Sequence, residues 1–104
     1  MDSIAVVVNG SSMWPTLKHG ESITVNPYTG QRLNVNDILV FYDPRDRTRI
    51  CIKRLKRIEP DGYFVEGDNP DPTASTDSHN YGLIHPTLIL SLIHISEPTR
   101  HTRL

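Results

Sequence analysis

The sequence has little cysteine, almost no net charge and no long hydrophobic run. A single cysteine among 104 residues excludes an internal disulfide, and no cysteine and histidine cluster has the spacing of a zinc site. Eleven basic and twelve acidic residues give a formal net charge of -1, so the composition gives no electrostatic reason to expect a nucleic-acid partner. We therefore expect no metal, no organic cofactor and no nucleic acid.

The longest hydrophobic stretches, residues 4–8 and 88–95, are far shorter than the roughly 20 residues of a membrane-spanning helix. The first follows an acidic residue and is rich in β-branched side chains, which favours a strand over a secretion signal. The length allows one domain with one active site. The default expectation is a cytoplasmic protein without a membrane span in this chain, and the alternative is membrane association through an anchor missing from this fragment.

Short β-branched or aromatic runs alternate with Pro, Gly, Asn and Asp, which is typical of an all-β domain. Helical periodicity is nearly absent. We predict strands at residues 4–9, 21–26, 37–42, 49–58, 63–66 and 83–90. Residues 68–80 hold two prolines and no hydrophobic pattern, so they predict a loop, and ordered loops of this length are often functional.

The tail of the sequence differs from the rest. Residues 90–100 resemble the translation of a transposon-type sequencing adapter read through in frame. We therefore divide the chain into a domain at residues 1–89 and a non-native tail at residues 90–104, which is left out of the functional reasoning. The alternative is a natural final strand followed by a frayed basic tail, and on either view His94 and His101 are not candidate ligands or bases.

The stretch GSSMWPTL, residues 10–17, directly follows the first predicted strand. Gly10 permits close backbone approach, and Pro15 blocks ladder pairing just beyond Ser12. Ser12 is therefore expected at a strand end in a fixed geometry. This arrangement suits a nucleophile, although a serine in such a setting more often caps a turn.

A serine nucleophile needs a base within hydrogen-bond reach, and the histidines do not supply one in an obvious place. His19 lies in a polar turn, His85 precedes a proline, and the consecutive side chains of residues 77–79 diverge. Lysine is the other candidate, because strand periodicity places Lys53 between two apolar residues on one face. Burial there would have to lower its pKa from about 10.4 to near 7, which is within the documented range. The alternative is one more exposed cation in a basic strand.

Three separated motifs occur in one order: GSSMWPTL, then Lys-Arg within a predicted strand, then Gly-Asp-Asn at 67–69 followed by Ser-Thr-Asp-Ser at 75–78 and a glycine at 82. This order, over residues 8–89, resembles the signal peptidase I superfamily of Ser/Lys proteases. Within it, the phrases NPY, VNDILV and VEGDNP are most similar to nickel-type superoxide dismutase maturation proteases. The resemblance implies a small, partly open β-barrel-like fold of the signal peptidase and SOS-repressor peptidase type. It also implies an endopeptidase that removes an N-terminal leader from a precursor protein.

The resemblance implies a role for each matching residue. Ser12 would be the nucleophile, and Lys53 the general base that later acts as general acid. Ser75 matches a serine that hydrogen-bonds the lysine. Asp77 matches an acidic residue that usually pairs with an arginine two positions later, where this sequence has His79. A histidine there would make the brace sensitive to pH.

By the same resemblance, the remaining candidates would support the site. Asp68, with Asn69, would shape the turn beneath the nucleophile. Gly10 stands where some signal peptidases carry a hydroxyl residue that holds the oxyanion, so the Ser12 backbone N–H would carry most of that charge. Met13 and Trp14 would form an apolar wall next to the nucleophile, although core packing explains a lone tryptophan equally well.

Three other functions stay open. The nearest is a signal peptidase I or inner-membrane-type peptidase whose anchor is missing from this fragment. A self-cleaving peptidase domain of an SOS-response repressor shares the Ser/Lys pair, but DNA-binding helices are absent and the Gly-Asp-Asn box argues against it. An inactive β module could instead bind peptides along an exposed strand edge.

Overall fold

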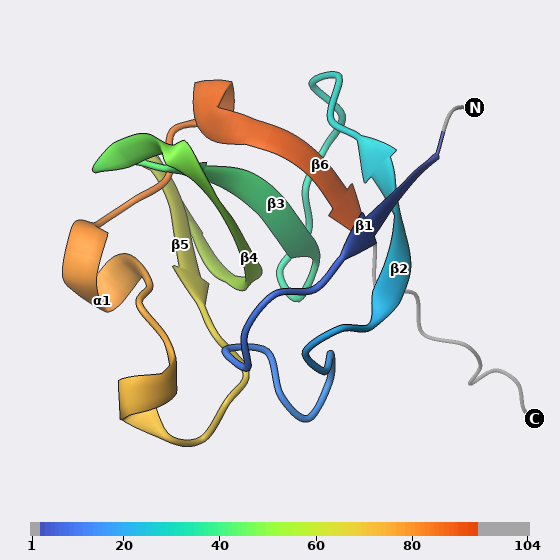
Figure 1. Ribbon diagram of the computed structural model, residues 1–104. Helices are drawn as coiled ribbons and strands as arrows, with labels where there is room; N and C mark the ends of the chain where they lie inside the picture. The colour runs from blue at the N-terminus through green and yellow to red at the C-terminus, as the bar shows by residue number, and fades with distance from the viewer. Residues whose placement is uncertain (1–2, 94–104) are drawn as a thin grey trace, which may run out of the picture.

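The computed structural model describes residues 3–93, and its six strands form one antiparallel sheet (Figure 1). The strands follow the order β1-β2-β6-β3-β4-β5. Their bounds are β1 Ile4–Val7, β2 Ser22–Pro27, β3 Ile38–Asp43, β4 Asp46–Glu59, β5 Gly62–Glu66 and β6 Ile89–Ile93. β1 and β5 lie at the two edges, so the sheet is not closed into a barrel. The prediction of an all-β domain is confirmed.

The last strand begins later than predicted. Residues 83–90 were expected to form it, but Ile84 makes only an isolated bridge to Tyr63 of β5. Pro86 then starts a short 3₁₀ helix, Pro86–Leu88, because proline fits a first helical turn and cannot donate to a ladder. β6 pairs with β3 and β2, and it includes residues 90–93 of the predicted tail. Residues 94–104, the rest of that tail, lie outside the described residues.

The segment predicted as a loop contains two short helical turns. A 3₁₀ helix spans Pro72–Ala74, and the one-turn helix α1 spans Ser78–Tyr81 and contacts β5 (Figure 1). Asp77 and Asn80 form a reciprocal capping box at the start of α1. Such local capping stabilises a turn that is too short to show hydrophobic periodicity, which is why the pattern predicted only a loop.

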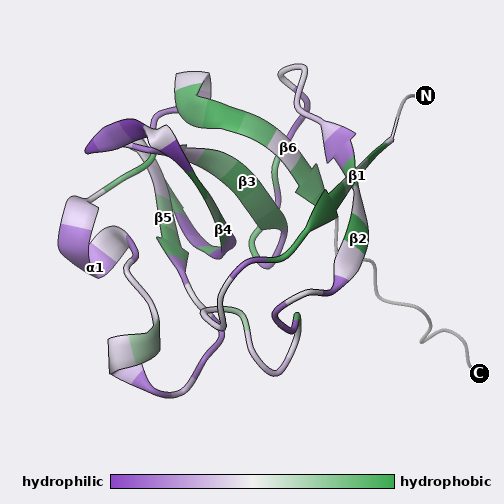
Figure 2. Cartoon of the chain, in the orientation of Figure 1, coloured by the Kyte–Doolittle hydropathy of each residue, from purple (hydrophilic) through white to green (hydrophobic). Residues whose placement is uncertain are grey.

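The buried hydrophobic side chains form two groups, which together make up the core. Hydrophobic residues run along β1, β3 and β6 (Figure 2). The larger group packs between β3, β4, β5 and β6 and comprises Leu33, Leu39, Phe41, Cys51, Leu55, Val65, Ile84, Leu88, Ile89 and Leu92. The smaller one comprises Val8, Met13, Leu17 and Ile38. Met13 and Leu17 belong to residues 10–17, so the smaller group anchors this segment in the core.

Candidate active site

The structure brings Ser12 and Lys53 together, although 41 positions separate them in the sequence. Ser12 lies in the turn that follows β1, and Lys53 lies in the middle of β4. The Lys53 Nζ atom donates a hydrogen bond to Ser12 Oγ over 2.9 Å. This distance is within the range at which a base can remove a hydroxyl proton.

Lys53 is buried among apolar groups, as strand periodicity predicted. Its side chain lies on the same face as Cys51 and Leu55, and only 6% of the residue is exposed. Burial lowers the pKa of Lys53 below its ordinary value, although the nearby Cys51 and Asp77 act in the opposite direction. The more distant positive charge of Arg49 lowers this pKa further. The neutral amine that a general base requires is thereby favoured.

Asn69 and Gly67 hold the nucleophile segment from one side. The Asn69 backbone N–H donates to Ser12 O over 2.9 Å, and its side-chain Nδ2 donates to Ser11 O over 2.7 Å. A Cβ atom on Gly67 would lie only 2.6 Å from Ser12 O, and it would also collide with the Ser75 hydroxyl. Residue 67 must therefore be glycine for the two segments to approach this closely.

Asp68 joins β4 to the nucleophile segment. Its carboxylate accepts hydrogen bonds from Arg54 Nη2 over 2.7 Å, from Arg54 Nε over 2.9 Å and from Thr16 Oγ1 over 2.6 Å. Burial would raise the pKa of Asp68, but the bonds from Arg54 and Thr16 outweigh burial and lower it. Asp68 thus lies beneath the site as predicted, in a bidentate ion pair with the residue next to Lys53.

A groove of about 820 Å³ opens beside the Ser12 and Lys53 pair. Four segments form most of its wall: β1 with residues 8–12, residues 49–53 of β4, residues 73–76, and the start of β6. A volume of this size is within the range of ligand-binding clefts. No set of three or more His, Cys, Asp or Glu residues within residues 3–93 is arranged to hold a metal ion.

Residues 3–56, just over half of the chain, match the family model described as "Signal peptidase, peptidase S26". The chain belongs to this family. Ser12 and Lys53 both lie inside the matched residues, whereas residues 67–78 follow them. The family assignment makes the chain a signal-peptidase-like serine protease with a protein substrate. No curated protein matches the chain.

The residues of this S26 peptidase that the structure describes include no helix long and apolar enough to cross a membrane. Ser75 lines the groove, but the hydrogen bond expected between Ser75 and Lys53 is not formed. The Ser75 Oγ atom is buried and has no hydrogen-bond partner within residues 3–93. The hydroxyl lies beside Gly67, where an added Cβ atom would collide with it.

Asp77 contacts His79, which stands in the place of the family's arginine. The Asp77 carboxylate accepts from His79 Nδ1 over 2.9 Å, from the His79 backbone N–H over 3.0 Å and from the Gly67 backbone N–H over 3.3 Å. The other ring nitrogen, His79 Nε2, lies 3.3 Å from Glu66 Oε2. The imidazole therefore connects the end of β5 with the cap of α1. The sequence indicated its contact with Asp77 but not its contact with Glu66.

Met13, which was expected in an apolar wall next to Ser12, does not line the groove. The residue is fully buried in the smaller core group with Val8, Leu17 and Ile38. A long apolar side chain gains more from this enclosed site than from the groove's edge. Met13 therefore anchors the nucleophile segment, while the neighbouring Trp14 remains 47% exposed.

Gly10 has a backbone conformation that residues other than glycine rarely adopt. Its φ is +95°, a region that favours glycine, and its N–H donates to His19 Nδ1 over 2.8 Å. The backbone N–H of Ser12 makes no hydrogen bond within the described part of the chain. That N–H is therefore available to an oxyanion.

Sequence reasoning missed three residues that support the site. His19 fixes Gly10, Arg54 pairs with Asp68, and Ser78 Oγ accepts from the Val65 backbone N–H over 2.9 Å. The strand alternation in Lys-Arg could have indicated Arg54, because it places the two cations on opposite faces. The contacts of His19 and Ser78 depend on turns that carry no sequence pattern.

Proposed function

We propose that the chain is a serine endopeptidase in which Ser12 is the nucleophile and Lys53 the general base. The observation that carries the proposal is the 2.9 Å contact between Lys53 Nζ and Ser12 Oγ, made by a lysine that is only 6% exposed. Burial disfavours the ammonium form, so the amine is able to accept a proton. Membership of the S26 family supports the same assignment.

In the first half of the reaction, neutral Lys53 takes the hydroxyl proton of Ser12 while Oγ attacks the carbonyl carbon of the peptide bond. The new C–O bond gives a tetrahedral intermediate, to whose oxyanion the Ser12 backbone N–H can donate a hydrogen bond. The C–N bond then breaks. The Lys53 ammonium returns the proton to the leaving amine, so the lysine ends this step neutral.

In the second half, the acyl group is released by water. Neutral Lys53 removes a proton from the water as its oxygen attacks the Ser12 ester. The ester C–O bond breaks, the carboxyl product leaves, and the proton returns to Ser12 Oγ. The step consumes one water and needs no oxidant or metal ion.

We further propose that the substrate is the precursor of a nickel-type superoxide dismutase, from which the enzyme removes the N-terminal leader. The phrases NPY, VNDILV and VEGDNP carry this narrower resemblance. They fall at the end of β2, at the start of β3 and at the end of β5. The last of them contains Gly67, Asp68 and Asn69, which hold the nucleophile segment.

A secretory precursor is the second candidate substrate. It is favoured by the description of the matched family, which names signal peptidase. The two candidates share the chemistry and differ in the sequence that occupies the groove. A direct comparison of the two precursors therefore distinguishes them.

The test mixes purified protein with a nickel-type dismutase precursor and, separately, with a secretory precursor. We expect the wild type to cut the dismutase precursor at the end of its leader. Ser12→Ala and Lys53→Met should each lower the rate by at least about a thousandfold. Mass spectrometry of the products locates the cut. Cleavage by all three proteins, or by none, contradicts the proposed mechanism, and cleavage of the secretory precursor alone contradicts the proposed substrate.

A further inference from the structure

The groove beside Ser12 carries positive charge and no negative charge. Among the described residues that line it, the only charged side chains are Arg49 and Lys53, and none is a carboxylate. If Lys53 is neutral during the reaction, Arg49 is the one permanent charge in the groove wall. The rest of the lining consists of hydrophobic, small and uncharged polar residues.

The guanidinium of Arg49 makes no direct polar contact with the fold, although its charge acts on the exposed carboxylate of Asp46. Arg49 is exposed and forms no ion pair or hydrogen bond through its side chain within residues 3–93. Its neighbour Arg45 on the same hairpin, in contrast, pairs with Asp43 and stacks over the Tyr81 ring. The donors of Arg49 are therefore available to a ligand in the groove.

The position of Arg49 on β4 gives its approximate distance from the bond that would be cleaved next to Ser12. Arg49 and Lys53 lie on one face of β4, four residues apart, which corresponds to about 13 Å along a strand. An extended peptide in the groove covers that length in about four residues. A substrate side chain near Arg49 is therefore several residues from the bond near Ser12.

We propose that Arg49 selects an acidic side chain of the substrate, about three to five residues from the cleaved bond. The inference rests on the proposed function and adds the substrate class to it. A guanidinium forms two parallel hydrogen bonds with a carboxylate, which an amide of the same shape cannot match. In a groove without a competing carboxylate, the preference for Glu over Gln should be about tenfold.

Binding to the inactive Ser12→Ala protein tests the inference separately from catalysis. The probes are fluorescein-labelled peptides of about twelve residues of Ala, Ser and Val, each with one Glu, Gln or Lys at a varied position. Fluorescence anisotropy should give an affinity for Glu peptides about tenfold above that for Gln peptides. Adding Arg49→Gln should remove the preference, and Arg49→Glu should transfer it to Lys peptides.

Two further variants exclude simpler explanations. Arg47→Gln removes an equally exposed arginine of the same hairpin that does not line the groove, so it should keep the preference. Lys53→Met in the Ser12→Ala background should also keep it, whereas loss there would assign the preference to Lys53. Circular dichroism checks that each variant is folded.

Equal binding of Glu and Gln peptides, absence of binding by any peptide, or a preference that survives Arg49→Gln overturns the inference. With the wild type, cuts should lie about three to five residues from Glu, and cuts unrelated to Glu would contradict it. A Glu preference in binding without any cleavage by the wild type would instead overturn the proposed function and leave the role of Arg49 intact.

Discussion

Lys53 and Arg54 are consecutive residues of β4, and their side chains leave the strand on opposite faces. Lys53 enters an apolar site, where its nearest polar partner is the hydroxyl of Ser12. Arg54 meets the carboxylate of Asp68, with which it forms a bidentate ion pair. The pKa of Lys53 is lowered by burial, while the hydrogen bonds to Asp68 raise the pKa of Arg54.

The difference separates the residue proposed as the base from a residue that supports it on the same strand. A lysine without a paired carboxylate can lose its proton and act as a base. The adjacent arginine keeps its charge, and Asp68 connects it to Thr16 in the nucleophile segment. The ion pair therefore helps to hold that segment next to β4, without itself having to contact the substrate.

The largest expected effect comes from changing the protonation of Lys53 by pH. Since the amine must be neutral to act as a base, the cleavage rate should rise about tenfold per pH unit and level off above the lowered pKa of Lys53. The plateau should begin well below the value of about 10.4 for free lysine. Initial rates in a series of buffers measure this, and a flat profile between about pH 6 and 9 would contradict it.

Stability gives an independent measurement of the same ionisation. Between the lowered pKa of Lys53 and about 10.4, the unfolded chain holds a proton that the folded chain lacks. The free energy of unfolding should therefore rise with pH across this window by up to about 1.4 kcal/mol per unit. Urea unfolding of wild type and Lys53→Met separates this contribution, because the variant should lack the rise.

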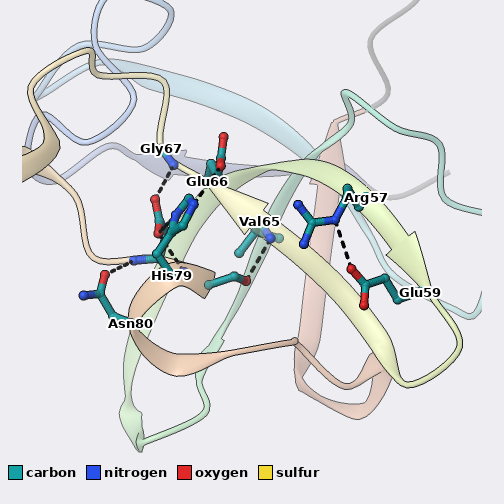
Figure 3. Close-up of polar contacts among 9 residues, drawn as sticks. Arg57, Glu59, Val65, Glu66, Gly67, His79 and Asn80 are labelled. Atoms are coloured by element: carbon teal, nitrogen blue, oxygen red, sulfur yellow. Dashed lines mark hydrogen bonds and ion pairs between the residues drawn. The ribbon is translucent and has the colours of Figure 1, made fainter.

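The second-largest effect is expected from disrupting the ion pair between Arg54 and Asp68. Asp68→Asn leaves a partly buried guanidinium with a weaker acceptor, so it should lower the free energy of unfolding by about 1 to 3 kcal/mol. Cleavage should slow as well, because Thr16 loses its partner. The matched control is Glu59→Gln, which breaks an exposed pair with Arg57 on the same strand and should cost less than about 1 kcal/mol (Figure 3). Equal costs for the two variants, measured by urea unfolding, would remove the structural distinction.

The sequence predicts the burial of Lys53 far better than it predicts the ion pair of Arg54 with Asp68. Burial of Lys53 follows from strand alternation between Cys51 and Leu55, which needs only local pattern. The pair between Arg54 and Asp68 depends on the pairing of β4 with β5, which brings the residues after the end of β5 next to the middle of β4. The other partner of Asp68, Thr16, is 52 positions away in the sequence. No periodic pattern encodes such a contact.

Two side chains differ from expectation for the same reason. Met13 was expected in an apolar wall next to Ser12, but it lies in the smaller core group. Ser75 was expected to reach Lys53 by resemblance alone, but its hydroxyl lies beside Gly67 and has no hydrogen-bond partner within residues 3–93. In both cases the direction of a side chain depends on a turn whose geometry the residue types do not determine.

The smallest expected effect concerns His79, which stands where the resemblance leads to an arginine. Both ring nitrogens face carboxylates, those of Asp77 and Glu66, and a neutral imidazole can donate to only one of them. Because a guanidinium can donate to both carboxylates at once, His79→Arg should keep both contacts, leave activity within about twofold of wild type and raise stability by a few tenths of a kcal/mol. His79→Gln is the control, which should lose one of the two contacts and a similarly small amount of stability. Thermal unfolding and cleavage rates measure the effect, and a severe loss of activity in His79→Arg would show that His79 does more than brace the loop.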